Sequence, residues 1–219
     1  MSLFSTAYLP PLAYVLEMMS SIDNICIEQH EHYTKQTYRN RCHLMGANGV
    51  FALSIPVMKK SNSKTCIKDL RIKYDENWQN NHWRSITSAY LSSPYFLYYQ
   101  SELEQFYHKK YDFLLDFNLE LFDYILSKMK VDLTYKLGAE FTPINTIEAD
   151  YRQSIHPKKT WQDESIIQPY KQVFAEKFDF QPNLSILDLL CNEGQNSENY
   201  FLECLNNKEK PKQRFIFPK

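Results

Sequence analysis

The first 28 residues constrain the fold more tightly than any other part of the chain. Residues 2–6 and 24–28 are short apolar segments of the kind that form buried strands. Between them, the prolines at positions 10 and 11 open a segment with the apolar spacing of a helix. Its apolar residues are Leu12, Val15, Leu16 and Met19. A helix enclosed by two strands in so short a stretch predicts a compact parallel βαβ unit.

The rest of the chain divides into a β-rich part and a helical part. Residues 46–49 (GANG) lie between two apolar runs and predict a β-hairpin, and residues 67–74 alternate like a half-buried strand. Residues 59–64 have the composition of a polar loop, and residues 140–162 lack a regular pattern. Helical spacing predicts helices over residues 78–91, 95–109, 111–129, 164–178 and 184–190.

These patterns predict a single domain of the α/β or α+β class. It comprises an α/β part (1–76) with the βαβ unit and the hairpin, a mainly helical part (77–207) and a basic tail (208–219). The hydrophobic share of 43% excludes a disordered chain. We predict no membrane span, because no stretch of about 18 apolar residues occurs. The N-terminus lacks the basic and apolar regions of a signal peptide, so we expect a cytoplasmic protein.

Charge, cysteine and glycine content exclude several classes of site. The formal net charge is −1, which argues against nucleic acid as a partner. The five cysteines have no CxxC spacing, which argues against a disulfide framework and against a thiolate zinc site. Only four glycines occur, and they form neither a P-loop nor a GxGxxG motif. An anion-binding site in this chain must therefore be local.

The densest group of polar side chains is the run KQTYRNRC, which begins at Lys35. Arg39 and Arg41 carry planar guanidinium groups suited to a carboxylate or phosphate, while Lys35 is a point charge. Asn40 adds an amide, and Tyr38 adds a ring that can stack or form a hydrogen bond. The run predicts an anion-binding segment; the alternative is a solvated basic loop.

A second polar group lies on the predicted helix over residues 78–91. His82 is a candidate general acid or base, because the pKa of an unperturbed histidine lies near neutrality. Arg84, Tyr90 and Tyr95 are candidates for the wall of the same pocket. The alternative is that His82 is a hydrogen-bonded core or surface residue. No GxSxG motif supports a nucleophilic serine.

Two further segments hold groups that could bind a metal or an anion. His30 and His32 would share one face of a strand, but two nitrogens do not make a full metal site, and we predict none. In the run EADYRQSIHPKK, Asp150 and Arg152 are candidates for orienting an anionic substrate. The same run also contains His156, Lys158 and Lys159. Its alternative interpretation is a salt-bridged surface loop.

Five segments in a fixed order carry a resemblance to a known family. They are YLPPLAY (8–14), IEQHEHYTKQTYRNRC (27–42), NGVFALSIPV (48–57), WQNNHWRSITSAYLSSPYF (78–96) and NLSILDLLCNEG (183–194). Together they resemble the WbqC-like family over most of residues 4–200. Many members of that family have a His-Gln-Pro-Asn-Tyr-Leu-Pro type segment after the first strand. Here Tyr8, Leu9 and Pro10 match it, while residues 4–7 (FSTA) do not and receive no role.

The resemblance implies a role in bacterial surface-polysaccharide or O-antigen biosynthesis. The protein would be a transferase that acts on a nucleotide-activated sugar or acyl donor, with an anionic small molecule such as a nucleotide-sugar as its ligand. The alternative is a non-catalytic protein that binds a sugar nucleotide or assists assembly in a glycan pathway. The sequence identifies no cofactor and no oligomeric state.

The expected site has a structural consequence. Residues 35–41, 81–95 and 150–159 should meet in one cleft. His82 is the catalytic candidate. The substrate-binding candidates are Tyr8, Lys35, Tyr38, Arg39, Asn40, Arg41, Arg84, Tyr90, Tyr95, Asp150 and Arg152.

Overall fold

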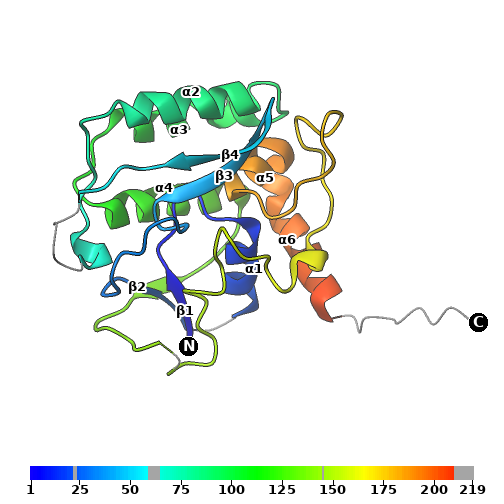
Figure 1. The fold of residues 1–219 in the computed structure, drawn as a ribbon. Coiled ribbons are helices and arrows are strands. Elements are labelled where there is room, and N and C mark those ends of the chain that lie inside the picture. Colours follow the sequence, from blue (N-terminus) through cyan, green and yellow to red (C-terminus); the bar gives the residue numbers. More distant parts are fainter. Residues whose placement is uncertain (22–23, 59–64, 145, 210–219) are drawn as a thin grey trace, which may run out of the picture.

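The computed structural model describes residues 1–21, 24–58, 65–144 and 146–209. It combines strands and helices in one chain, so the predicted mixed α/β class is confirmed (Figure 1). The polar loop expected at residues 59–64 and nearly all of the expected basic tail lie outside the described residues.

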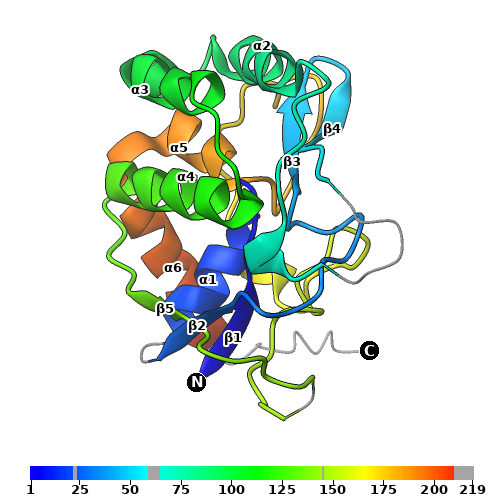
Figure 2. The same ribbon diagram turned by 90° about the vertical axis from the view of Figure 1, so that its left-hand side faces the viewer.

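The N-terminal βαβ unit is present as predicted. Strand β1 (Ser2–Ser5) pairs in parallel with β2 (Ile25–Glu28), and helix α1 (Leu12–Ser20) connects them. Both strands are buried along their whole length, which explains their apolar sequences. The sequence reasoning did not identify β5 (Tyr135–Leu137), which adds a third parallel strand beside β2. Figure 2 shows the three strands together at the N-terminal end of the molecule.

The other edge of β1 is covered by residue Asp150, which forms an isolated parallel bridge with Leu3. The Leu3 amide donates to the Ala149 carbonyl at 2.9 Å, and the Tyr151 amide donates to the Leu3 carbonyl at 2.8 Å. The chain therefore leaves β1 on one side to form β2, and much later returns to β1 on its other side.

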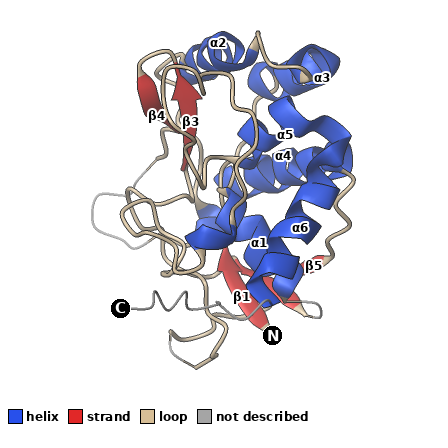
Figure 3. Ribbon diagram, turned by 90° about the vertical axis from the view of Figure 1, so that its right-hand side faces the viewer, coloured by secondary structure: helices blue, strands red, loops and turns tan. Residues whose placement is uncertain are grey.

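The predicted hairpin consists of β3 (Arg41–Gly46) and β4 (Gly49–Ser54), paired antiparallel. Gly49 has a φ of 103°, a left-handed conformation that the tight turn requires and that glycine adopts without strain. Helix α2 (Trp78–Tyr90) packs against β3. Figure 3 shows the hairpin beneath α2 and separate from the parallel strands.

The strand predicted over residues 67–74 is wrong. The segment forms the short 3-10 helix η1 (Ile67–Asp69) and then only single bridges to other segments. Its amides bond to unrelated partners: the Ile67 amide donates to the Glu31 carbonyl and the Ile72 amide to the Asp112 carbonyl. Burial alternates only over residues 69–73, and within the described residues no continuous strand pairs with this segment.

Three of the predicted helices are α2, α3 (Phe96–His108) and α4 (Leu114–Met129), and a fourth is α5 (Ile186–Glu193). The helix predicted over residues 164–178 is wrong, because only the 3-10 turn η2 (Glu164–Ile166) forms there. Pro169 follows this turn and cannot continue a helical hydrogen-bond ladder.

Two further C-terminal elements were not predicted. They are η3 (Gly194–Asn196) and α6 (Ser197–Glu209), of which α6 packs against α1. In the described part of the chain, no helix combines the length and apolar character needed to cross a membrane.

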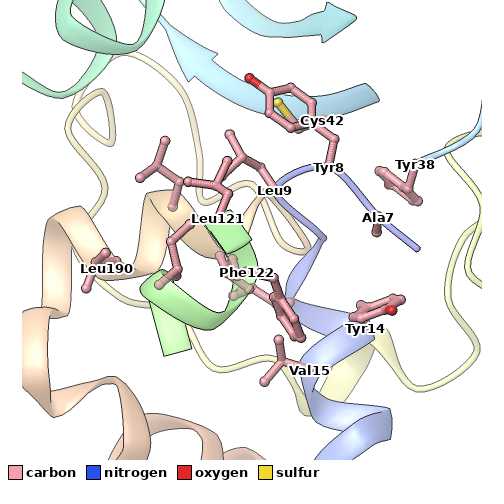
Figure 4. Close-up of a cluster of buried hydrophobic side chains, with 14 of the residues drawn as sticks. Ala7, Tyr8, Leu9, Tyr14, Val15, Tyr38, Cys42, Leu121, Phe122 and Leu190 are labelled. Carbon is pink, nitrogen blue, oxygen red and sulfur yellow. The ribbon is translucent and has the colours of Figure 1, made fainter. Parts of the chain in front are cut away.

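A single hydrophobic core connects these elements. Figure 4 shows Leu9, which follows β1, close to Leu121 of α4, with Val15 of α1 beneath them in this view. The core also includes the hairpin residue Cys42 and Leu190 of α5. The strands and the helices therefore share one core, and this packing fixes the positions of the loops that follow β1 and β2.

Candidate functional site

Polar residues gather where β1 and β2 end. Because the strands are parallel, their carboxyl ends lie at the same edge of the sheet, with Ser5 at the end of β1 and Glu28 at the end of β2. Asp150 lies on the opposite side of β1 from β2. In open α/β sheets, ligands bind outside the carboxyl ends of strands at a point where the chain order reverses in this way.

A cleft of about 470 Å³ opens at this edge. Its walls come from three segments that are distant in sequence: residues 31–39, 141–144 and 152–159. The predicted meeting of residues 35–41 with residues 150–159 therefore occurs here. Residues 81–95 contribute nothing to the walls of this cleft.

Arg39 is the central cation of the cleft. It is buried, and its Nε and Nη2 donate to the two carboxylate oxygens of Glu31 at 2.8 and 2.6 Å. This bidentate pair holds the guanidinium plane in one orientation. Among the described residues, no group accepts a hydrogen bond from its Nη1 amino group. Since Arg39 also lines the cleft, Nη1 remains able to bind an anionic ligand.

Helix α4 positions the loop that carries Arg39. The side-chain amide of Asn118 donates to the Arg39 carbonyl at 2.8 Å and to the Thr6 hydroxyl at 3.1 Å. The Tyr8 amide donates to the Tyr38 carbonyl at 2.9 Å. The segments that follow β1 and β2 are therefore joined to each other and to α4. Asn118 was missed in the sequence, although it is a polar residue inside an apolar helical stripe.

Arg152 has a structural role at the same site. Its Nε and Nη2 donate to the Asp150 carboxylate at 2.9 and 2.6 Å, and its Nη1 donates to the Thr142 carbonyl at 2.8 Å. The Glu28 carboxylate lies 3.7 Å from Nη1. Burial alone would raise the pKa of Asp150, but the hydrogen bonds from Arg152 lower it. Arg152 thus ties the wall over residues 141–144 to the sheet, with its donors already engaged.

Three further side chains complete the cleft. His32 and Lys159 are exposed on its walls, and His156 is half-buried beside them. Burial, followed by the charges of Lys159, Lys158 and Arg39, lowers the pKa of His156. The motif HPKK at residues 156–159 was noted in the sequence, but His156 received no role there.

Ser5 has an unpaired hydroxyl beneath the cleft. Its Oγ is buried, and no described residue bonds to it. Ser5 lines a narrow space of about 10 Å³, together with Tyr38, Arg39 and Arg152. That volume is about enough for one water molecule, which a polar site of this kind favours. Ser5, the last residue of β1, therefore places a buried hydroxyl in the same narrow space as Arg39 and Arg152.

The structure places His82 in the aromatic core. Its Nδ1 lies 2.9 Å from the Tyr8 hydroxyl, which also bonds to the Tyr107 hydroxyl at 2.9 Å. The rings of Trp78 and Tyr8 pack against the imidazole. Burial lowers the pKa of His82 to about 4, so the ring is neutral near physiological pH. Both His82 and Tyr8 are separate from the walls of the cleft.

The other candidates of the KQTYRNRC run face different surroundings. Asn40 donates to the Ile55 carbonyl at 2.7 Å, and Arg41 donates from Nε to the Ser54 hydroxyl at 3.0 Å. Lys35 is exposed. Tyr38 is buried beside the cleft, and burial raises the pKa of its hydroxyl to about 12. Of this run, Thr37 and Arg39 line the cleft, and Arg39 is the cation among them.

The remaining candidates lie elsewhere in the fold. Arg84 lines a separate cleft of about 430 Å³ next to the hairpin turn. Tyr90 is fully buried near Asp188, and Tyr95 lies against Gly194. As for a metal, the described residues contain no group of three or more His, Cys, Asp or Glu side chains placed to hold an ion.

Comparison with known proteins adds two findings. The family model described as "WbqC-like protein family" matches residues 6–152. The match includes the cleft residues from Glu31 to Arg152 and ends before Gln153, His156 and Lys159. The uncharacterized protein Rv1507c of Mycobacterium tuberculosis is 24% identical over 224 residues, which cover 90% of this chain and 95% of that protein. No solved structure is significantly similar to the chain.

Proposed function

This chain belongs to the WbqC-like protein family, and from that premise we propose that it is a transferase of surface-polysaccharide biosynthesis. Its substrate is a nucleotide-activated sugar or acyl donor, bound in the cleft at the carboxyl ends of β1 and β2. The observation that carries the proposal is the Arg39 guanidinium, which is held by Glu31 with Nη1 left for a ligand. The diphosphate group of a nucleotide-activated substrate supplies the anionic oxygens that a guanidinium group binds.

The chemistry of the walls supports a ligand that is only partly ionic. Phe141 and Ile144 are 48% and 49% exposed and give the cleft an apolar part. Both line the cleft, and the Arg152 guanidinium lies 5.9 Å from the centre of the Phe141 ring. An apolar wall of this type suits the face of a base or sugar ring, while Lys159 and Arg39 suit phosphate oxygens.

The charge balance of the buried groups favours directed hydrogen bonds over bulk attraction. Two buried guanidinium groups, those of Arg39 and Arg152, lie among three carboxylates, those of Glu28, Glu31 and Asp150. The buried cluster therefore carries no excess positive charge. We expect monovalent anions to bind weakly, a diphosphate to bind through directed hydrogen bonds, and a larger ligand that also contacts the apolar wall to bind best.

A thermal-shift panel tests the proposal with nucleotide-sugars, nucleotides, acyl-coenzyme A compounds and simple anions. A ligand that binds only the folded state raises the melting temperature. We expect a nucleotide-linked compound to give the largest shift. Lys159→Ala should reduce that shift, while Lys171→Ala, which removes an exposed lysine that does not line the cleft, should leave it unchanged. Equal shifts in both variants would place the ligand elsewhere.

Turnover is tested separately from binding. The donor that gives the largest shift is incubated with sugar acceptors, and the release of free nucleotide is followed by chromatography. A transferase releases nucleotide only when an acceptor is present. Binding of the donor without acceptor-dependent release would favour the non-catalytic alternative.

One surface feature favours that alternative, a partner protein of a glycan pathway. Leu97 and Tyr98 at the start of α3 are 64% and 75% exposed, and Leu91 and Tyr95 beside them are also exposed. Contiguous exposed apolar side chains often mark protein contacts. A Leu97→Ser and Tyr98→Ser double variant should leave turnover unchanged if the protein acts alone as an enzyme. Loss of activity only in mixtures with pathway enzymes would support the partner role.

A further inference from the structure

We infer that His156 is a ligand-binding residue of the cleft and is fixed as a neutral imidazole that offers its Nε2–H to a diphosphate oxygen. The inference rests on the proposed function for the identity of the ligand. The state of the ring follows from the local geometry alone and has its own test.

The residues HPKK form a tight turn that fixes the ring. The Lys159 amide donates to the His156 carbonyl at 2.9 Å, which closes a four-residue turn with Pro157 at its second position. Within this turn, the Lys158 amide donates to Nδ1 of the His156 ring at 3.1 Å. Proline favours the second position because its ring sets φ to the value that the turn needs.

The hydrogen bond to Nδ1 determines the tautomer. A backbone amide can only donate, so Nδ1 must be unprotonated and act as the acceptor. The single ring proton of the neutral imidazole is then on Nε2. Protonation of Nδ1 would break the bond to Lys158 and would place two hydrogens against each other. His156 is therefore a hydrogen-bond donor to the cleft and not a general base in this arrangement.

The charges around His156 oppose its protonation as well. The cations that face it are Lys158 and Lys159 of its own turn and Arg39 and Arg152 of the other walls. The carboxylates of Glu31 and Asp150 are occupied by the two arginines, and His32 adds a second imidazole to the cleft. Burial and the nearby cations lower the pKa of His156, which agrees in direction with the neutral ring that the hydrogen bond from the Lys158 amide requires.

A diphosphate group suits these two donors. Arg39 presents a charged N–H through Nη1, and His156 presents a neutral N–H through Nε2, in walls of the same cleft. A neutral donor adds a directed bond without adding charge to a cluster in which two guanidinium groups already face three carboxylates. Together the two donors recognise a ligand by the positions of its phosphate oxygens and not by its net charge.

The binding experiment uses calorimetry on the full chain with inorganic pyrophosphate as the probe. His156→Ala should weaken binding about tenfold, the equivalent of one hydrogen bond to a charged acceptor. His156→Gln, which retains an N–H donor near the position of Nε2, should bind within about twofold of the parent protein. His108→Ala, at an exposed histidine of α3, is the matched control and should have no effect.

The pH dependence separates a neutral from a charged histidine. Pyrophosphate itself titrates in this range, so the parent protein is compared with His156→Gln between about pH 6 and pH 8. Parallel profiles are expected for a neutral donor. If parent binding weakens relative to His156→Gln as the pH rises, His156 binds as an imidazolium and the inference is overturned.

A ligand-free measurement keeps the inference distinct from the proposed function. Long-range ¹H–¹⁵N correlation spectra report which ring nitrogen of a histidine carries the proton. The Nε2–H tautomer at His156 is expected without any ligand, and the Nδ1–H tautomer or a charged ring would overturn the inference. A folded protein with the expected tautomer that binds no pyrophosphate and no nucleotide-sugar would refute the proposed function and the ligand role of His156.

Discussion

Arg39 differs from its neighbours in the KQTYRNRC run because its charge is compensated inside the protein. Lys35 and Arg41 reach solvent or a surface hydroxyl, while Arg39 is buried against Glu31 with two hydrogen bonds below 3 Å. A buried ion pair is weak evidence of stability, but removing one partner leaves an uncompensated charge. The pair thus fixes the orientation of the guanidinium more than it stabilises the fold.

The consequence is a difference between single and double substitution. Arg39→Met should lower the free energy of unfolding by about 3–5 kcal/mol, because Glu31 stays buried without its partner. The double variant Arg39→Met with Glu31→Leu should recover most of that loss and still fail to bind the ligand. Urea denaturation gives the free energies. A double variant as unstable as the single one would show that the pair has a larger net value than we expect.

The pH dependence of stability reports on the buried carboxyl group of Asp188. Burial raises its pKa from 3.8 to about 6, although Tyr170 and Gln172 donate hydrogen bonds to it. Between these two values the folded state keeps a proton that the unfolded state has released. Raising the pH through this window should therefore lower the free energy of unfolding, by an amount on the order of 3 kcal/mol.

Asp188→Asn should remove this loss, so the stability difference between variant and parent should grow from about pH 4 to pH 6 and then stay constant. Urea denaturation over this pH range measures it. His82 acts in the opposite sense, since burial lowers its pKa from 6.5 to about 4 and stability rises as the pH passes through that window. His82→Gln should therefore change the pH dependence of the free energy of unfolding in the direction opposite to Asp188→Asn. A change in the same direction in both variants would contradict the pKa shifts assigned to these two groups.

At the scale of the elements, α4 connects the apolar core to the candidate site. Its apolar stripe includes Phe117, Leu121 and Ile125, all buried as its spacing predicted. Asn118 lies on the same buried face and bonds to Thr6 and to the Arg39 carbonyl. The helix therefore both fills the core and fixes the loops at the ends of β1 and β2.

Asn118→Leu tests this second role. The substitution preserves volume but leaves the Arg39 carbonyl and the Thr6 hydroxyl without a donor, which should cost about 1–3 kcal/mol of stability. Ligand affinity should fall as well, because the Arg39 loop is less firmly held. Asn199→Leu, on the exposed surface of α6, is the control for a change of side-chain type. Unchanged affinity in a stable Asn118→Leu protein would show that the loop is held by other contacts.

The elements themselves were predictable to different degrees. The βαβ unit, the hairpin and helices α2, α3 and α4 follow from local periodicity, and the structure contains them near the expected bounds. Residues 67–74 and 164–178 have similar local patterns but form a turn and irregular structure. In the first case, pairing needs a neighbouring strand, and the part of the chain that the structure describes offers only single bridges there. In the second, a proline and side-chain bonds to the backbone, such as that of Gln172, replace the helical ladder.

At the scale of the whole molecule, the described part of the chain shares one core. The N-terminal helix α1 and the C-terminal helix α6 are packed together, and Lys208 of α6 lies 3.2 Å from the buried Glu17 of α1 and 3.1 Å from Asp163. The indole of Trp161 also donates to Glu17, at 2.9 Å. Residues 1–76 and 77–207 are therefore parts of one folding unit in our interpretation.

One cooperative unfolding transition is expected from this arrangement. Calorimetric and van't Hoff enthalpies should agree, as they do for single domains. Lys208→Met should lower the melting temperature of that one transition, because Glu17 loses a charged partner. Two separate transitions, in the parent or in the variant, would mean that the α/β part and the helical part fold independently.

The sequence by itself determined the elements whose pattern repeats along the chain and the segments rich in polar groups. Periodicity of two or of 3.6 residues is a local property, so it can be read without the fold. The tertiary structure decides which of these polar residues line the cleft and which are buried in the core. Asn118 holds Arg39 from 79 positions away, and packing buries His82 in the core while the turn at Pro157 brings His156 to the cleft. Which cation is compensated and which histidine meets a ligand depend on contacts between distant segments, and no local spacing encodes them.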